Sequence, residues 1–395
     1  MNISDKILKI ISRKCSWYPP AETKIPFSTL FAALLPFKAD FRNEICRYLE
    51  VDQCICAESG RALLTLVLQA LSKRNGMQQD EVLIPGYTCY SVAASVVRAG
   101  LRIGVYDLDP KTLQPDIDSV KRAINNKTIV IVAQHLFGIP STLNELKCLA
   151  RDVGAYTIED AAQAIGGSLN GCQLGKMADF GFFSFGRGKP LPLGCGGVLI
   201  GKDPLFLHEI HPMKVVRGYG RLFATAVAQI LSHDKLYGIM EALPLGLGET
   251  IFNPNFLISS MPLVMQRLGT RTLGTLKTLN AYRRTIAGIY SDLLKDYENV
   301  PVQEGAYPIY TRFPLMAGSK RIPQNLKRFG VRRMYPKALV DEPAIRRFFA
   351  DKMARTPGAS RIAERLITLP THTGISQDTA ETIAIKLQMG FGHPS

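Results

Sequence analysis

The chain has 395 residues, of which 46% are apolar and 21% charged, the composition of an ordinary globular protein. This composition excludes a disordered chain, a collagen and a small disulfide-stabilised domain. Basic side chains outnumber acidic ones by 48 to 33, and residues 201–395 alone hold 26 basic against 15 acidic residues. The excess positive charge indicates an anionic partner: a phosphorylated small molecule, a nucleic acid or a membrane surface.

Residues 1–40 contain four prolines and are predicted to form an N-terminal arm. They hold no apolar run long enough for a secretory signal. The eight cysteines are scattered, without a CxxC pair or a zinc-ligand spacing, so we expect reduced thiols and no metal site. Together these features predict a cytoplasmic protein.

From about residue 55 to residue 205 the sequence alternates short β-branched runs with amphipathic helical patterns. Strands are predicted at 82–84, 103–106, 128–133, 156–159, 182–185 and 198–200, and helices at 62–71, 91–99, 116–124 and 143–153. Repeated βα units predict an α/β fold with a mostly parallel sheet covered by helices. In such a sheet, ligands bind at the carboxyl ends of the strands.

The C-terminal part of the chain has a different pattern. A long helical pattern over 263–294 is predicted to link a large domain, residues 41–256, to a smaller α+β domain, residues 257–395. Within the small domain we expect a strand in 308–315 and a final helix near 379–387.

Residues 222–231 (LFATAVAQIL) come nearest to a spanning helix, but they fall short of the roughly 18 apolar residues that one needs. No transmembrane segment is therefore expected. Phe223, Val227 and Ile230 follow helical spacing, which predicts an amphipathic helix whose apolar side faces the core. Peripheral contact of residues 222–248 with a membrane surface is the alternative.

Polar side chains lie just beyond two of the predicted strands. Asp160 and Gln163 follow the strand at 156–159. Lys189 lies five residues beyond Ser184, near the end of the next strand. Because the carboxyl ends of parallel strands share one edge of a sheet, we expect these four side chains to lie close together.

Two further segments are expected at the same edge. Tyr87 and Tyr90 follow the first predicted strand. Ser59, Gly60 and Arg61 precede a predicted helix, whose first backbone N–H groups form an anion-binding site.

A lysine, a carboxylate, an aromatic ring and an anion-binding helix start are together what pyridoxal 5′-phosphate (PLP) requires. The lysine forms a Schiff base, and the carboxylate keeps the ring nitrogen protonated so that the ring withdraws electrons. Each piece alone has a structural explanation: an Asp after a strand is usually a cap, and a loop lysine is usually solvated. The four pieces in this order favour a PLP site.

At these residues the chain resembles the DegT/DnrJ/EryC1/StrS family of sugar aminotransferases. The resemblance runs from about residue 43 to residue 390, and it implies the architecture of fold type I PLP-dependent transferases. The segments that carry it are IEDAAQAIGG, ADFGFFSFGRGKPL and the Gly196-Gly197 pair, supported by SGRALL, HLFG and LPTH.

The resemblance also implies residue roles. Lys189 matches the Schiff-base lysine, and Asp160 matches the carboxylate on the pyridine nitrogen. Gln163 matches the residue beside the 3′-oxygen of the cofactor. Ser184 matches the phosphate-binding serine, and Ser59 belongs to the phosphate-binding helix start.

The chain departs from the family pattern at several of these positions. Arg61 stands where the family has Thr after Gly60, so a hydroxyl is exchanged for a cation that can bind phosphate. The ring-stacking aromatic falls at Cys89, which cannot stack, so Tyr90 or Tyr87 is expected to cover the ring.

A further departure concerns the subunit interface. The family places an Asn from the partner subunit on the phosphate, and here residues 246–256 offer Asn253 or Asn255 instead. Enzymes resembling this one are symmetric dimers. We therefore expect a homodimer in which this segment of one chain lies near the cofactor of the other.

The residues that bind the substrate are the least constrained by the resemblance. Met334 replaces the histidine that the family has before Tyr335-Pro336. Tyr335, Arg333 and His372 are the substrate-contact candidates.

The resemblance implies a PLP-dependent aminotransferase that moves an amino group from an amino-acid donor, glutamate, to a nucleotide-linked keto sugar in polysaccharide or glycan biosynthesis. The alternatives are another PLP reaction on a sugar, dehydration or lyase chemistry, and a non-catalytic PLP-binding regulator. Lys189 argues against the dehydratase branch, which has His there. The basic residues form only short pairs without interleaved aromatics, so no nucleic-acid partner is expected.

Overall fold

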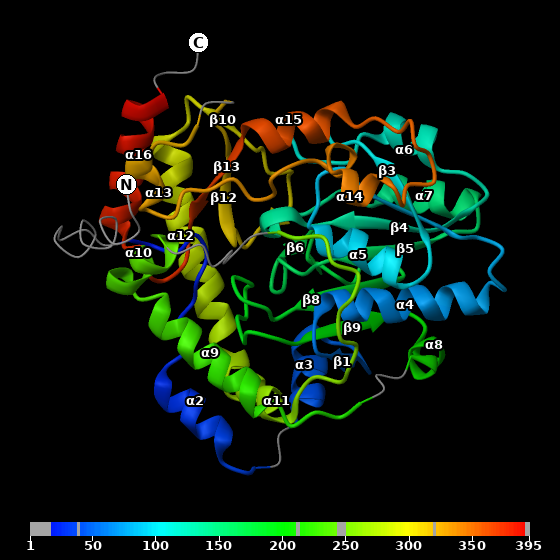
Figure 1. Cartoon of the computed structure of the whole chain (residues 1–395), viewed down its shortest axis with the longest axis horizontal. Helices are drawn as coiled ribbons and strands as arrows, with labels where there is room; N and C mark the ends of the chain where they lie inside the picture. Colours follow the sequence, from blue (N-terminus) through cyan, green and yellow to red (C-terminus); the bar gives the residue numbers. More distant parts are fainter. Residues whose placement is uncertain (1–16, 38–39, 211–213, 243–249, 319–320, 392–395) are drawn as a thin grey trace.

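The computed structural model describes residues 17–391, apart from 38–39, 211–213, 243–249 and 319–320. Seven strands form the central sheet in the order β1-β9-β8-β5-β4-β2-β3, with helices packed against it (Figure 1). These strands are β1 (Ile55–Ala57), β2 (Glu81–Pro85), β3 (Arg102–Tyr106), β4 (Thr128–Gln134), β5 (Tyr156–Asp160), β8 (Phe180–Ser184) and β9 (Gly197–Gly201).

The predicted mostly parallel sheet is confirmed. Strands β3, β2, β4, β5 and β8 pair in parallel, whereas β9 runs antiparallel to β8 and to β1. The reversal at β9 arises because the loop over 185–196 contains no crossover helix, which a parallel connection requires. That loop carries Lys189. Each predicted strand and helix of this region is present, with ends that differ by a few residues.

Helices follow most of the strands and cover the sheet. They are α4 (Gly60–Arg74), α5 (Tyr90–Arg98), α6 (Ile117–Ala123), α7 (Asn144–Asp152) and α8 (Pro204–Glu209). Every residue of β4 is buried, as expected of an apolar strand at the centre of a sheet covered on both faces. The carboxyl ends of β4, β5 and β8 are thereby held in a rigid layer.

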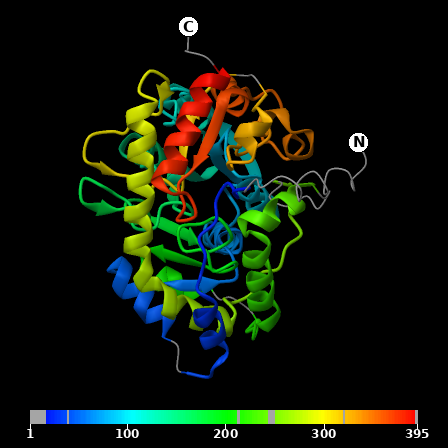
Figure 2. The same ribbon diagram turned by 90° about the vertical axis from the view of Figure 1, so that its left-hand side faces the viewer.

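A second, antiparallel sheet of β10 (Glu298–Asn299), β12 (Arg312–Met316) and β13 (Leu366–Pro370) packs with α12 (Leu276–Leu293) and α16 (Gln377–Phe391). Figure 2 shows α12 upright at the left, beside α16. The single linking helix predicted over 263–294 is instead α11 (Leu263–Thr272), a 3₁₀ turn and then α12. The core of the central sheet also includes Tyr335 and Leu366, so the domain boundaries stay a prediction.

The remaining elements are short. They are α2 (Phe27–Leu34), α3 (Phe41–Leu49), β6 (Ser168–Leu169), β7 (Cys172–Gln173), α9 (Tyr219–Leu231), α10 (Asp234–Ala242), β11 (Ala306–Tyr307), α13 (Gln324–Lys327), α14 (Pro343–Arg346) and α15 (Pro357–Arg365), with 3₁₀ turns at Leu136–Gly138, Leu273–Thr275 and Leu339–Asp341. Strands β11, β6 and β7 form a small third sheet.

The helix predicted over 222–231 exists as α9, but its orientation differs from the expectation. Phe223 is 72% exposed and Ile230 is 49% exposed, whereas Thr225 and Gln229 are buried. Helical spacing shows which residues share a face but not which face the protein covers, so the core-facing prediction is wrong for these side chains. Among the described residues, no helix combines the length and apolarity needed to cross a bilayer.

The N-terminal segment begins in the described structure at Trp17, and residues 1–16 of the predicted arm lie outside it. Tyr18 N donates to Arg328 O in the small domain at 2.7 Å, and Trp17 N donates to Asp234 O at 2.9 Å. Further along, Glu22 forms an ion pair of 3.5 Å with Arg187 in the loop that carries the predicted lysine. The segment therefore connects the small domain to that loop.

Candidate active site

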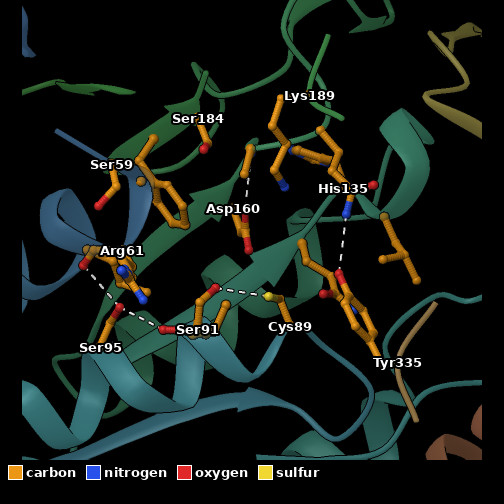
Figure 3. A pocket seen from close by; sticks show the side chains of 18 residues that line it. Ser59, Arg61, Cys89, Ser91, Ser95, His135, Asp160, Ser184, Lys189 and Tyr335 are labelled. Atoms are coloured by element: carbon orange, nitrogen blue, oxygen red, sulfur yellow. Dashed lines mark hydrogen bonds between the residues drawn. The ribbon is translucent and has the colours of Figure 1, made fainter. Parts of the chain in front are cut away.

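A cavity of about 260 Å³ lies at the carboxyl ends of β4, β5 and β8 (Figure 3). Eight of the twelve predicted site residues line it: Ser59, Gly60, Arg61, Asp160, Gln163, Ser184, Lys189 and Tyr335. Residues far apart in the sequence are thus brought to one place, at the sheet edge where the strand pattern predicted a ligand.

The amino end of α4 forms one wall of this cavity. Ser59 caps the helix, accepting a hydrogen bond from Ala62 N at 3.3 Å. A Cβ built on Gly60 would lie 3.1 Å from Ser184 Cβ, so a larger residue at this position would push the first turn away from the end of β8. The backbone N–H groups of this turn, carrying the positive end of the helix dipole, are suited to bind a phosphate.

Arg61 adds a full positive charge at the same wall. Its guanidinium lies 4.6 Å from the centre of the Phe256 ring, which supports it from one side. Its backbone carbonyl accepts a hydrogen bond from Ser95 Oγ at 3.0 Å, so helix α5 fixes the turn from below. The predicted replacement of a hydroxyl by a cation therefore places that cation in the cavity wall.

Asp160 ends β5 and lies in the cavity with Lys189. Burial raises the pKa of its carboxyl, and the charge of Lys189 and the N–H of Ala162 act against that rise. Within the described part of the chain, the hydrogen bond from Ala162 N, at 3.1 Å to Oδ1, is the one that this carboxylate accepts. A carboxylate in this position favours a cationic ligand atom opposite it.

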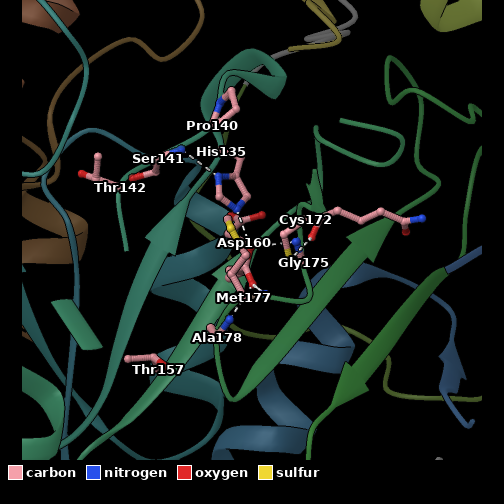
Figure 4. A network of polar contacts seen from close by, with 12 residues as sticks. His135, Pro140, Ser141, Thr142, Thr157, Asp160, Cys172, Gly175, Met177 and Ala178 are labelled. Carbon is pink, nitrogen blue, oxygen red and sulfur yellow. Dashed lines mark hydrogen bonds and ion pairs between the residues drawn. The ribbon is translucent and has the colours of Figure 1, made fainter. Parts of the chain in front are cut away.

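The adjacent Glu159, on the opposite face of the strand, belongs to a buried network with His135, which Figure 4 shows. His135 Nε2 donates to Glu159 Oε2 at 2.7 Å, because Nδ1 of the same ring already accepts from Ser141 N. Both side chains are fully buried. The network fixes the end of β4 against β5, and so fixes the backbone that carries Asp160.

Three backbone N–H groups complete the coordination of Glu159. They belong to Gly175, Met177 and Ala178, at 2.6–2.7 Å. Burial acts to raise the pKa of Glu159, but the hydrogen bond from His135 and those from the backbone outweigh it and hold the pKa below the ordinary value of 4.5. The carboxylate is therefore ionised and ties the loop over 175–178 to the sheet.

The aromatic side chain expected to stack on the cofactor ring is not provided to the cavity by Tyr87 or Tyr90. Neither Tyr87 nor Tyr90 lines the cavity: Tyr87 is fully buried behind it, and Tyr90 donates to Lys337 O. Cys89 does line the cavity, as does Tyr335, whose ring centre lies 5.2 Å from that of Tyr87. Tyr87 thus supports the aromatic ring of Tyr335, which enters the cavity from the small domain side of the chain.

Gln163 is held by polar contacts on both ends of its amide. Its Nε2 donates to the Tyr335 hydroxyl at 3.4 Å, and its Oε1 accepts from Thr311 Oγ1 at 3.2 Å. These contacts join three separate segments at the cavity.

Two predicted substrate contacts lie outside the cavity. His372 is buried, and its Nε2 lies 2.9 Å from Pro19 O in the N-terminal segment. Burial lowers the pKa of His372 to about 4, so this ring is neutral and serves the contact with that segment. Arg333 instead lines a neighbouring cleft.

That cleft has a volume of about 580 Å³ and a basic lining, with Thr250, Ile251, Ile322, Met334 and Pro336 between the cations. The cations are Arg321, Lys327, Arg332 and Arg333. Arg332 forms an ion pair of 2.7 Å with Glu241. Tyr335, which lines the cavity, stands in the chain between Met334 and Pro336, which line the cleft, so the two hollows lie near each other.

Sequence reasoning missed several side chains of the cavity. Ser91 and Ser95, one helical turn apart at the start of α5, line it together with His135. Ser91 Oγ lies 3.0 Å from Cys89 Sγ, and Ser95 Oγ donates to Ser91 O at 2.8 Å (Figure 3). The four-residue spacing of two serines at a helix start after a predicted strand was the available signal.

The lining residues fit PLP on three observations. Asp160 offers a carboxylate whose second oxygen accepts no hydrogen bond from the described residues. The first turn of α4, with Ser184 and Arg61, offers phosphate ligands. Lys189 extends into the cavity from the loop between β8 and β9.

The sheet order, with a lysine loop before its antiparallel strand, defines the fold type I architecture of PLP-dependent transferases. The model of the DegT/DnrJ/EryC1/StrS aminotransferase family matches residues 29–388. The chain belongs to this family.

Named relatives agree with this membership. Over 256 residues the chain is 33% identical to an L-glutamine:2-deoxy-scyllo-inosose aminotransferase of Streptomyces kanamyceticus, a match that covers 65% of this chain but only 56% of that protein. It is 25% identical, over 93% of its own length and 92% of the other, to a dTDP-4-dehydro-2,3,6-trideoxy-D-glucose 4-aminotransferase of Saccharopolyspora spinosa.

A solved structure shows the same fold. It is an aminotransferase of this family from Brucella abortus, which matches with a TM-score of 0.69 at 20% identity, over 99% of this chain and 96% of that one.

We predict that Glu159→Gln lowers the free energy of unfolding at neutral pH by about 2 kcal/mol or more, because a buried hydrogen-bond acceptor is weakened. The depressed pKa of Glu159 adds stability above pH 4.5 that is lost as the pH falls below it. The difference in free energy of unfolding between wild type and variant should therefore become smaller in acid. Chemical denaturation at several pH values measures this difference. Glu145→Gln, at the exposed start of α7, is the control. A difference in free energy of unfolding that stays constant across pH would contradict the assignment of an ionised carboxylate to Glu159.

Proposed function

We propose that the chain is a PLP-dependent aminotransferase that moves an amino group from glutamate to a nucleotide-linked keto sugar. The observation that carries the proposal is the placement of Lys189, Asp160 and the first turn of α4 around one cavity in a chain of this family. PLP supplies an electron sink that stabilises negative charge on the reacting carbon.

Each wall of the cavity has one task in this proposal. The N–H groups of the first α4 turn, Ser184 and Arg61 bind the phosphate. Asp160 holds the ring nitrogen in its protonated form. Tyr335 takes the place of the missing ring-stacking aromatic, since it is the tyrosine that lines the cavity.

Lys189 both anchors the cofactor and handles the proton. Its ammonium group extends from a loop whose backbone is closed by Lys189 N donating to Gly186 O at 3.2 Å. With PLP bound, Nζ of Lys189 would hold the cofactor, and the same amine, once released, would remove the proton from the substrate carbon and return it. A histidine at this position, as in the dehydratase branch of the resemblance, has no primary amine for the anchoring task.

The nearby basic cleft supports a phosphorylated acceptor. A nucleotide-linked sugar carries a diphosphate, and Arg321, Lys327 and Arg333 line a hollow near the cavity. Arginine forks bind phosphate oxygens in pairs. In this proposal the sugar enters the cavity past Tyr335 while its diphosphate lies among these cations.

The assembly and location follow the same reasoning. We propose a homodimer in which the segment 246–256 reaches the partner's cavity; residues 246–249 lie outside the described structure, and Asn253 and Asn255 are exposed. We also propose a cytoplasmic location, supported by free thiols at each described cysteine, including Cys46 and Cys54, which contact each other.

The proposed activity is tested by incubating the protein with PLP, glutamate and a panel of dTDP- and GDP-linked 4-keto sugars. Mass spectrometry should then find an amino sugar and 2-oxoglutarate in equal amounts. Recovery of dehydrated sugar without amination would show that the chain catalyses the alternative reaction, dehydration of the sugar. Conversion of glutamate with no sugar of the panel aminated would reject the substrate class.

We predict that Asp160→Asn retains cofactor but slows the glutamate half-reaction by about 100-fold or more, since the protonated ring nitrogen loses its charge partner. Stopped-flow absorbance follows this half-reaction without any sugar. Asp116→Asn, at the cap of α6, is a matched control with the same chemical change outside the cavity. Wild-type conversion by a folded, cofactor-loaded Asp160→Asn would remove Asp160 from the mechanism.

A further inference from the structure

Helix α9 buries two polar side chains and exposes large apolar ones to solvent. Its buried residues are Leu222, Thr225 and Gln229, whereas Tyr219, Phe223 and Ile230 are exposed by 51%, 72% and 49%. A surface helix of a water-soluble protein has the opposite arrangement. The exposed face therefore indicates a non-aqueous neighbour.

Hydrogen bonds fix this orientation. Thr225 Oγ1 donates to Leu193 O at 3.1 Å, in the loop that carries the active-site lysine. Gln229 Oε1 accepts from the backbone N–H of Ile25, just before α2. Rotating the helix to bury Phe223 would break both contacts and leave buried backbone groups of Leu193 and Ile25 unpaired, which is unfavourable.

Helix α2 packs beside α9 (Figure 1), and its exposed apolar side chains add to those of α9. It buries Leu30 and Ala33 against the protein. We define the apolar face as the exposed side chains of both helices and of Leu35 after α2: Phe27, Phe31, Leu34, Leu35, Tyr219, Phe223 and Ile230. Exposed apolar side chains gathered in this way mark an interaction site.

The most exposed charged side chains of the two segments that hold the apolar face are cations. The exposed cations of the two segments 17–36 and 214–236 are Lys24, Lys214, Arg217, Arg221 and Lys235. Of these, Arg221 forms an ion pair of 3.6 Å with the buried Glu58. The same segments contain two acids: Glu22 is buried beside Arg187, and Asp234, whose side chain is 35% exposed, lies 2.7 Å from His233.

Exposed aromatic side chains with cations in the same segments suit the boundary between lipid headgroups and acyl chains. The rings enter the acyl boundary while the cations meet anionic headgroups. A second copy of the chain fits less well, because a symmetric contact would bring two positively charged faces together. The sequence of residues 1–16 adds four basic residues against one acidic residue.

We propose that the apolar face of α2 and α9 docks the protein on an anionic lipid bilayer, as a peripheral membrane protein. The surface is separate from the cavity, so this proposal does not depend on the proposed function. The sequence had already offered membrane contact of residues 222–248 as an alternative. The present proposal assigns the contact to side chains of α2 and α9 instead, since part of the range 222–248 lies outside the described residues.

The test is sedimentation of the full chain with vesicles of phosphatidylcholine alone or of phosphatidylcholine and phosphatidylglycerol in equal parts. Wild type should bind the anionic vesicles about tenfold or more tightly than the neutral ones, and high salt should weaken this binding. The double variant Phe31→Ser/Phe223→Ser should lose at least about tenfold in affinity, because two rings no longer enter the lipid. Both side chains are exposed, so folding should persist, which circular dichroism checks.

Met353→Ser is the matched control, since Met353 is 71% exposed but lies outside the apolar face. It should bind like wild type. Equal binding to both vesicle types, or equal loss in Met353→Ser, would overturn the proposal. Absence of vesicle binding, with a dimer that dissociates in the double variant by analytical ultracentrifugation, would assign the face to self-association instead.

Discussion

The close approach of α4 to the ends of β8 and β9 is the constraint on which the candidate site depends. A Cβ on Gly197 would lie 2.5 Å from Phe183 O and 3.0 Å from Gly60 N, so no larger residue fits at Gly197 without a shift of the backbone. The approach places helix N–H groups, Ser184 and the lysine loop around one cavity. Phosphate binding and Schiff-base chemistry are thereby brought together by backbone packing rather than by flexible side chains.

Two other features keep the opposite wall in place. Glu159 and His135 lock the ends of β5 and β4, so Asp160 is presented from a rigid strand end. Arg187, beside the lysine, is held by Glu22 of the N-terminal segment. The same segment bonds α9 through Ile25, so the lysine loop and the apolar face share one scaffold although they have different tasks.

The sequence was sufficient for the central sheet and for most of the cavity. Apolar β-branched runs such as 128–133 identify buried strands, and parallel strands bring their ends together, which places Asp160, Ser184 and Lys189 correctly at one edge. The antiparallel β9 escaped prediction because strand direction depends on the connection, not on the strand.

What the sequence could not supply depends on long-range packing. Tyr335 was expected at the site as a substrate contact, but its packing against a buried Tyr87 was not. That packing follows from how a segment almost 250 residues later folds back, as in the hydrogen bond that Tyr335 N donates to Tyr87 Oη. The orientation of α9 is set by Leu193 and Ile25, neither of which is near it in sequence. Periodicity contains neither piece of information.

The central claim is that Lys189 is the residue that binds PLP covalently. Borohydride reduction of the PLP-loaded protein, followed by peptide mapping, tests it directly. The account predicts one pyridoxyl group per chain, attached to Lys189, and no incorporation at this peptide in Lys189→Ala. A pyridoxyl group attached mainly to another lysine, with Lys189 unmodified, would contradict it.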